Sequence, residues 1–124
     1  MTQLTPEDRS MLIRQLDAMR RQVLSELRDT APQALAEAML NARQEVRTHA
    51  DQAEAEREDE VRLAGIEVDR QRLLDIERAQ LRLSDGRYGV CVDCGKDIAR
   101  ARLLAQPIAV RCAACQTALE ARRR

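Results

Sequence analysis

Aromatic side chains are almost absent from this chain of 124 residues, which has one tyrosine, Tyr88, and neither tryptophan nor phenylalanine. Glycine and proline are scarce too, with four and three residues. So few aromatics exclude a large core built on bulky rings, and they leave little on which single-stranded nucleic acid could stack its bases. Charged residues make up 34% of the chain, and Ala and Leu supply most of the apolar content. This composition is typical of long exposed helices.

Long apolar runs are also missing. No segment approaches the roughly 18 residues that a membrane span requires, and the N-terminus does not resemble a signal peptide. We therefore expect a cytoplasmic protein without membrane contact. The chain has a single histidine, His49, and a lone histidine on a helix is usually structural. Without a histidine-based catalytic pair, we do not expect an enzyme.

The four cysteines of the chain form two CxxC pairs, Cys91 with Cys94 and Cys112 with Cys115, separated by seventeen residues. Two such turns can bring four thiolates into a tetrahedron, which predicts a closed site for one Zn²⁺. Gly95 follows the first pair, where a turn that folds back over sulfur favours positive φ. The alternatives are two disulfides, which suit a secreted chain, or a redox-active CxxC, which needs a βαβ context that is not seen here.

A site with four thiolate ligands has no open coordination position at which to activate water, so the zinc is expected to be structural. The surrounding ribbon of about thirty residues has too little apolar area to fold alone. Metal binding is therefore expected to supply the free energy that folds it.

Formal net charge is zero, but the charges are unevenly distributed. Residues 51–60 hold six acids and one base, whereas residues 96–124 hold seven bases and two acids. The chain thus has an acidic middle and a basic C-terminal end, although such runs are most often solvated helix faces.

The helical pattern begins at Thr5, a capping residue followed by proline and two acids. Apolar residues then recur at spacings of three and four: Leu12, Leu16, Met19, Val23 and Leu27. We expect this helix to end near Arg28, because Pro32 follows. Residues 1–32 are accordingly predicted to supply the N-terminal helix of a globular part.

Residues 33–84 are predicted to form a long antiparallel coiled-coil hairpin. One stripe has a four-three alternation, typical of a seam: Leu35, Met39, Ala42, Val46, His49 and Ala53. A second helix is expected from about Arg57 to Ser84, stopped by Asp85-Gly86, with this stripe: Leu63, Ile66, Leu73, Ile76 and Leu83, widened by Leu74 and Leu81. The turn is placed near His49 to Glu54, with the tip near 48–54, although one continuous helix remains an alternative. The fold is then all-α, with a four-cysteine zinc finger and terminal helix over residues 85–124.

The C-terminal part resembles the DksA/TraR family of bacterial RNA-polymerase-binding transcription factors. The matching run is Tyr-Gly-Val-Cys91-Val-Asp-Cys94-Gly, followed by Ile98, Arg102, Pro107 and Cys112-Ala-Ala-Cys115. These positions are more specific than the CxxC pairs alone, and they place the strongest likeness in residues 84–119. The layout of helix, helical hairpin and finger is similar to the longer DksA type.

The resemblance implies a monomeric partner of RNA polymerase that inserts its arm into the secondary channel and modulates initiation, without sequence-specific DNA binding of its own. In the family the arm tip reads Asp-x-x-Asp-x-Ala. Counting back from Cys91 aligns Asp51 and Ala53 with this motif as tip effector residues, while Thr48 replaces the first carboxylate.

Members of the family also respond to the alarmone ppGpp, bound partly by bases near the finger. Here Gln106, Gln116 and Asp75 occupy positions where the family usually has Arg or Lys. The loss of three positive charges around an anionic ligand predicts a weak or absent ppGpp response.

Two other classes of function remain open. A zinc ribbon that binds nucleic acid would use the basic C-terminus, including Arg122-Arg123-Arg124, but the chain lacks aromatics and net positive charge. A structural adaptor would dimerise through the seam between Leu35 and Val46, which the mass in solution would reveal.

Overall fold

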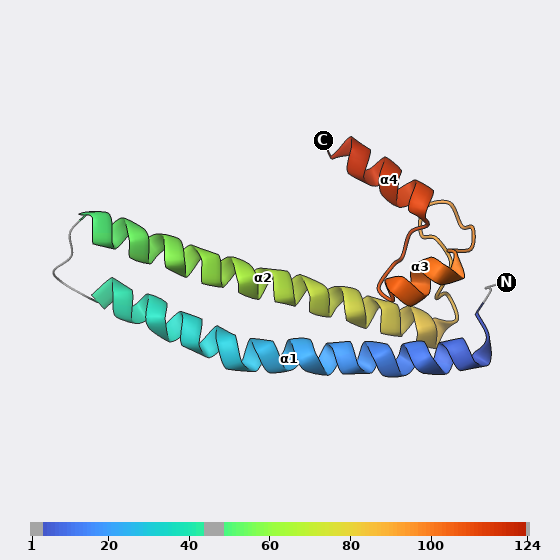
Figure 1. The fold of residues 1–124 in the computed structure, drawn as a ribbon, viewed down its shortest axis with the longest axis horizontal. Helices are drawn as coiled ribbons and strands as arrows, with labels where there is room; N and C mark the ends of the chain where they lie inside the picture. The colour runs from blue at the N-terminus through green and yellow to red at the C-terminus, as the bar shows by residue number, and fades with distance from the viewer. Residues whose placement is uncertain (1–3, 44–48, 124) are drawn as a thin grey trace. The chain divides into compact units, whose positions relative to one another are not determined.

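In a computed structural model, described for residues 4–43 and 49–123, the protein consists of two long and two short helices (Figure 1). Their bounds are α1 (Pro6–Arg43), α2 (His49–Asp85), α3 (Arg100–Ala105) and α4 (Ala113–Arg122). The described residues contain no strand, only an isolated antiparallel bridge between Val90 and Asp97. The predicted all-α class is confirmed.

The chain divides into two compact units. The finger unit comprises Met1–Arg20 and Leu74–Arg124, and the arm unit comprises Arg21–Leu73. Each long helix therefore contributes one part to each unit. The division into residues 1–32, 33–84 and 85–124 stays a prediction.

Helix α1 begins where the capping pattern predicts. The Thr5 hydroxyl accepts a hydrogen bond from the Asp8 backbone N–H at 3.1 Å, and the Asp8 carboxylate accepts one from the Thr5 N–H at 3.1 Å. This reciprocal pair satisfies two N–H groups that the first turn of a helix otherwise leaves without partners.

The core of the finger unit lies where α1, α2 and the finger meet. Its buried side chains come from α1, from the end of α2 and from the segment after it: Leu12, Leu16, Ile76, Ala79, Tyr88, Cys91, Ile98, Leu103 and Val110. The predicted stripe on α1 is confirmed, because Leu12, Leu16 and Val23 are buried, and Met19 and Leu27 are half-buried. The finger itself thus supplies about half of the small core that it shares with the helices.

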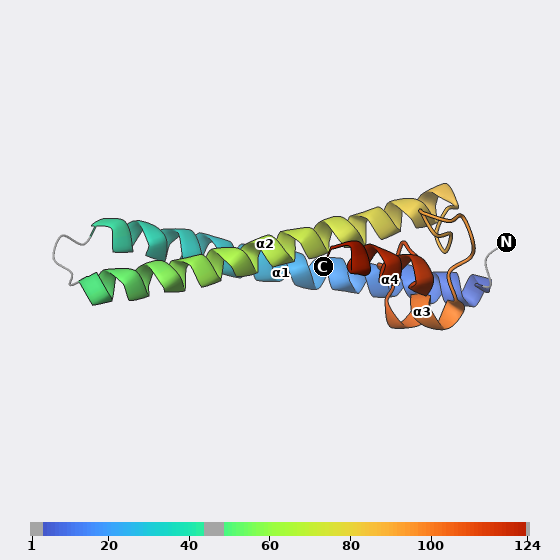
Figure 2. The same ribbon diagram turned by 90° about the horizontal axis from the view of Figure 1, so that it is seen from above.

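In the arm unit, residues 21–43 of α1 and 49–73 of α2 run side by side and antiparallel (Figures 1 and 2). The predicted seam is wrong at Leu35 and Met39, which are 59% and 50% exposed. Leu63 is also exposed on the facing helix, whereas Ile66 is buried. A two-helix coiled coil buries only the side chains that face the partner helix, so with these three exposed the arm buries little. Ala42, Val46 and His49 have side chains outside the described residues.

The predicted end of the first helix near Arg28 is wrong, because α1 continues through Pro32 to Arg43. Proline removes one hydrogen bond, here the one that the Arg28 carbonyl would accept. Both Arg28 and Pro32 are exposed, so water can bind that carbonyl. The surrounding Ala, Leu, Gln and Glu residues are strong helix formers and carry the helix across this position.

The hairpin prediction is confirmed in kind and shifted in position. Helix α1 ends at Arg43, and α2 already begins at His49 and not at the predicted Arg57. The predicted turn at His49–Glu54 is therefore the start of α2. The alternative of one continuous helix is wrong. Asp51 lies in the first turn of α2, where the positive end of the helix dipole favours an acid. Thr48 lies outside the described residues.

No helix over residues 4–43 and 49–123 combines the length and apolarity that crossing a bilayer requires.

Candidate metal centre

The four cysteines come together in the finger unit. Their sulfur atoms all lie within 4.8 Å of one another, and the Sγ atoms of Cys94 and Cys112 are 3.8 Å apart. With Zn–S bonds of about 2.3 Å, two sulfurs of a tetrahedral site lie about 3.8 Å apart. The set therefore fits Zn²⁺ in both donor chemistry and size, and the predicted cofactor of one Zn²⁺ is confirmed.

The first CxxC turn is shaped by backbone hydrogen bonds around Cys91. The Gly95 N–H donates to the Cys91 carbonyl at 3.0 Å, and the Cys91 N–H donates to the Lys96 carbonyl at 2.8 Å. Gly95 has a φ of 76°, as its position in the sequence predicts. The turn continues into the Val90–Asp97 bridge and a 2.7 Å bond from the Ile98 N–H to the Gly89 carbonyl. These bonds close a compact knuckle around the most buried of the four cysteines.

The second CxxC turn is the start of α4. Cys112 is the N-cap of this helix, and its sulfur accepts from the Cys115 N–H at 3.5 Å. The N-terminal end of a helix carries partial positive charge, which favours thiolate over thiol. This pair of ligands is thus placed by helix geometry, whereas the first pair is placed by a turn.

The electrostatics differ between the two pairs. Burial acts to raise the pKa of the Cys91 thiol, but backbone N–H groups of Cys94, Cys112 and Asp93 stabilise its thiolate and bring that pKa down to about 6. The pKa of Cys115 is raised to about 12, first by its hydrogen bond with Cys112 and then by the other sulfurs and burial. Four-thiolate ligation must therefore release protons, so the zinc affinity should fall as the pH falls.

Tyr88 ties the two halves of the finger together. It is 1% exposed, and its hydroxyl donates to the Pro107 carbonyl at 2.8 Å. A further bond of 2.9 Å joins the Val92 N–H to the Val110 carbonyl. The segments that precede and contain the first CxxC turn are thereby held to the segment that leads to the second.

Replacing Tyr88 with phenylalanine should destabilise the finger unit by about 1–3 kcal/mol, because the buried Pro107 carbonyl loses its donor while the ring is kept. Urea unfolding of the zinc-loaded protein measures this difference. Burial raises the pKa of Tyr88 to about 12. The unfolded chain thus loses this proton first, and the advantage of the wild type over Y88F should shrink as the pH rises above about 10. A variant as stable as the wild type at pH 7 would contradict the assigned role of this bond.

The N-terminus of α1 is fastened to α3 by an ion pair that the sequence gives no sign of. The Arg100 guanidinium donates from Nε and Nη2 to both carboxylate oxygens of Asp8, each at 2.8 Å. The hydrogen bonds from Arg100 and from the Thr5 backbone hold the pKa of Asp8 well below its usual range. The capping box that includes Asp8 thus also positions the helix that follows the first CxxC turn.

The predicted tip residues lie in the arm unit. Asp51 and Ala53 are exposed in the first turns of α2. Most of the predicted acidic segment is exposed as well: Glu54, Glu56, Glu58 and Glu60, with Asp59 half-buried and paired with Arg62 at 2.6 Å. The start of α2 therefore presents a strongly acidic surface.

The three positions that depart from the family pattern carry no positive charge of their own. Gln106 is exposed at the end of α3. The Gln116 amide donates to the Glu120 carboxylate at 3.0 Å, and Asp75 accepts from Arg78 at 3.4 Å.

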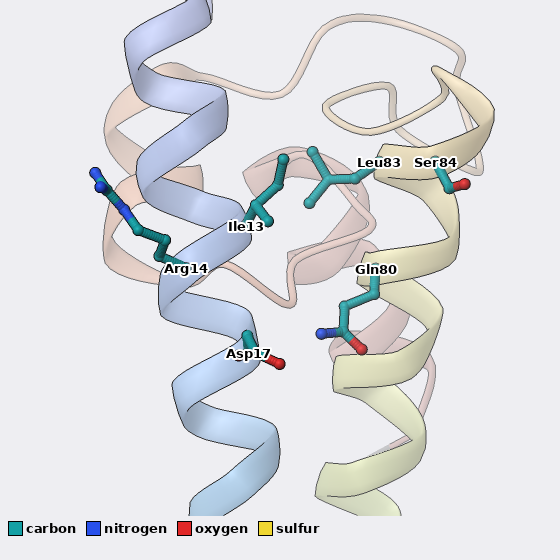
Figure 3. A pocket seen from close by; sticks show the side chains of 6 residues that line it. All are labelled: Ile13, Arg14, Asp17, Gln80, Leu83 and Ser84. Atoms are coloured by element: carbon teal, nitrogen blue, oxygen red, sulfur yellow. The ribbon is translucent and has the colours of Figure 1, made fainter.

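Apart from the cysteines, the finger unit has an open cleft of about 410 Å³ between α1 and α2 (Figure 3). Ile13 of α1 and Leu83 of α2 point toward one another across it, and so do Asp17 of α1 and Gln80 of α2. The lining contains one carboxylate and neither cysteine nor histidine. It offers an apolar depression rather than a second metal site.

Comparison with known proteins agrees with these features. Residues 86–121 match the model of the prokaryotic dksA/traR C4-type zinc finger. The solved structure of the transcription factor DksA2 from Pseudomonas aeruginosa superposes with a TM-score of 0.76 over 95% of this chain and 87% of that chain, at 24% sequence identity. No curated protein sequence gives a match. The family resemblance predicted from the finger residues is confirmed, and the likeness to DksA2 extends the same fold to the helical arm.

Proposed function

We propose that this chain, which belongs to the DksA/TraR family by its C4-type finger and has the fold of DksA2, is a transcription regulator that binds RNA polymerase. One observation carries the proposal: the chain combines the family's zinc finger with a two-helix arm, in a fold that matches a transcription factor over nearly the whole chain. The chain is not proposed to be an enzyme, because a four-thiolate zinc has no open coordination position.

The arm suits entry into a narrow channel. A helical hairpin two helices wide can reach a site that a globular domain cannot enter, and the arm part of α2, residues 49–73, is about 38 Å long at 1.5 Å per residue. Its exposed acids, beginning with Asp51, would be attracted to a basic or metal-containing cavity. We therefore propose the secondary channel as the binding site, with Asp51 and Ala53 as the effector residues of the tip.

The role proposed for the finger is structural. The four cysteines Cys91, Cys94, Cys112 and Cys115 would hold one Zn²⁺, which supplies the folding free energy of the finger and no reaction chemistry. Tyr88 and Ile98 of the finger are buried in the core that the finger unit builds with residues of α1 and the end of α2. Loss of the metal would therefore disturb the parts of α1 and α2 that belong to the finger unit.

A pull-down with core RNA polymerase tests the proposal. The full chain should retain the polymerase, and a variant that carries Leu63→Pro should serve as a negative control, because proline in the interior of α2 breaks the arm helix. Absence of polymerase from the wild-type pull-down would refute the function. Recovery of DNA or RNA without polymerase would instead favour the nucleic-acid-binding ribbon, and a dimeric mass without polymerase would favour the coiled-coil adaptor.

The regulator is proposed to act with little help from ppGpp. Gln106, Gln116 and Asp75 offer no positive charge, and a Gln amide has neither the Coulombic attraction nor the multiple donors of arginine. Two nearby bases already have partners: Arg102 donates to the Arg111 carbonyl at 3.0 Å, and Arg111 pairs with Asp93 at 2.8 Å.

In vitro transcription with polymerase whose own alarmone site is disabled should therefore give the same effect with and without ppGpp. The matched variant Gln106→Arg and Gln116→Arg restores two cations and is expected to gain a ppGpp response, since each charge-assisted hydrogen bond contributes about 1.5–3 kcal/mol. A several-fold ppGpp enhancement with the wild-type protein would contradict this proposal.

A further inference from the structure

The carbonyl that immediately precedes each CxxC pair accepts a hydrogen bond from an arginine of another segment. Arg82, near the end of α2, donates from Nη2 to the Val90 carbonyl and, at 3.0 Å, to the Arg87 carbonyl. Arg102, in α3, donates from Nε to the Arg111 carbonyl at 3.0 Å. Val90 precedes Cys91, and Arg111 precedes Cys112. Each CxxC turn, or knuckle, therefore has its preceding carbonyl bound by an arginine from another segment.

Both arginines are shielded from water to different degrees. Arg82 is only 9% exposed, and Arg102 is half-buried. Their hydrogen bonds given by the structure go to backbone carbonyls rather than to carboxylates. A buried cation without an acidic partner is costly, which points to another source of negative charge nearby.

The zinc centre is that source. Four thiolates around one Zn²⁺ carry a net charge of −2, and two arginines offset it. Burial lowers the pKa of Arg82, as do Arg87 and Arg78, while the Cys91 sulfur acts in the opposite direction, as expected for a thiolate close to the guanidinium. Arginine stays protonated in proteins, so its charge is permanent.

Arg111 has a different task, although it lies directly beside Cys112. Its Nε donates to the Asp93 carboxylate at 2.8 Å, which links the second knuckle to the first. Because Asp93 neutralises this cation, Arg111 adds little net charge to the centre. Arg82 and Arg102 instead donate to the carbonyls that precede Cys91 and Cys112, and these hydrogen bonds do not neutralise their charge.

We propose that Arg82 and Arg102 are paired positioning residues of the zinc centre, which fix the two CxxC turns by their preceding carbonyls and raise zinc affinity by offsetting the charge of the tetrathiolate. Polar groups behind metal ligands typically change metal affinity by about 10–100-fold when removed. This inference concerns the metal centre alone and does not depend on polymerase binding.

Competition between the full-length protein and a chromophoric chelator for Zn²⁺ tests the proposal. Arg82→Gln and Arg102→Gln should each weaken zinc binding by about 10-fold or more, and the double variant should bind more weakly than either. Arg82→Lys and Arg102→Lys keep the charge and should recover most of the affinity. Arg123→Gln removes an exposed base of the same unit and should bind zinc as the wild type does.

A second readout separates charge from packing. With Co²⁺ in place of Zn²⁺, loss of a nearby positive charge should move the thiolate-to-metal charge-transfer band of the Gln variants to lower energy, while the Lys variants keep the wild-type band. Zinc affinities of both Gln variants within about two-fold of the wild type would overturn the proposal. So would Lys variants as weak as the Gln variants, since charge would then have no part. If Arg82→Gln does not fold, the zinc affinities of Arg102→Gln and Arg102→Lys test the proposal by the same criteria, because Arg102 is less buried.

Discussion

Removal of zinc is expected to unfold the finger while leaving the arm helical. The ligands are the principal source of stability for residues 86–121, and structural zinc contributes about 10 kcal/mol or more in small zinc domains. Metal analysis of the purified protein should give one Zn per chain. After chelation, amide protection should be lost in α3, α4 and the two knuckles.

The arm serves as the internal control for this experiment. Helices α3 and α4 have 6 and 10 residues, against 38 and 37 in α1 and α2, so the far-ultraviolet circular dichroism should fall by only a minor fraction. Cys94→Ser, which replaces the exposed ligand with a weaker one, should reproduce the loss of protection at limiting zinc. Reduced, folded protein with almost no bound zinc would contradict the prediction.

Asp51→Asn is expected to abolish the transcriptional effect while leaving polymerase binding almost intact. An exposed carboxylate contributes about 0–1 kcal/mol to binding. The binding free energy of the variant should therefore differ from that of the wild type by at most about 1 kcal/mol. The effect on initiation depends instead on a charge delivered to the polymerase, and asparagine keeps the shape of the side chain without that charge. Transcription from a sensitive promoter and a binding titration, run on the same preparation, measure the two quantities separately.

Glu60→Gln is the matched control, because it removes another exposed acid of α2 farther from the helix start. It should alter neither binding nor initiation. If Asp51→Asn left initiation unchanged while binding persisted, Asp51 would not be the effector, and the departure at Thr48 would then extend to the whole tip motif.

Features set by neighbouring residues could be predicted from the sequence. The CxxC spacing predicts the cysteine cluster, and Gly95 adopts the positive φ expected of it. The capping pattern places the start of α1, and Gly86, with a φ of 75°, follows the end of α2. Each of these depends on a turn or on one helix end, where few residues decide the geometry.

Features that depend on competition between local and longer-range effects could not be predicted from the sequence. Pro32 is a local helix breaker, yet the helix formers on both sides carry α1 past it. Leu35 and Met39 have seam periodicity, but periodicity alone does not reveal which residues of α1 face the partner helix.

Polar contacts between residues far apart in the chain produce no recognisable pattern in the sequence. Asp8 and Arg100 are 92 positions apart, and Arg82 differs in no visible way from the exposed arginines of α2. Only the capping spacing of Thr5 and Asp8 hints that Asp8 has a structural task. The chemistry of the metal ligands was therefore predictable, whereas the groups that orient them required the structure.

The buried Tyr88 can serve as an intrinsic spectroscopic probe of the finger unit. As the single aromatic residue of the chain, it is the sole source of aromatic near-ultraviolet absorbance, fluorescence and dichroism. Because the ring is enclosed and its hydroxyl is bound to Pro107, these signals report on the finger unit alone. Metal binding and finger unfolding can thus be followed in the unlabelled protein, with no contribution from the arm.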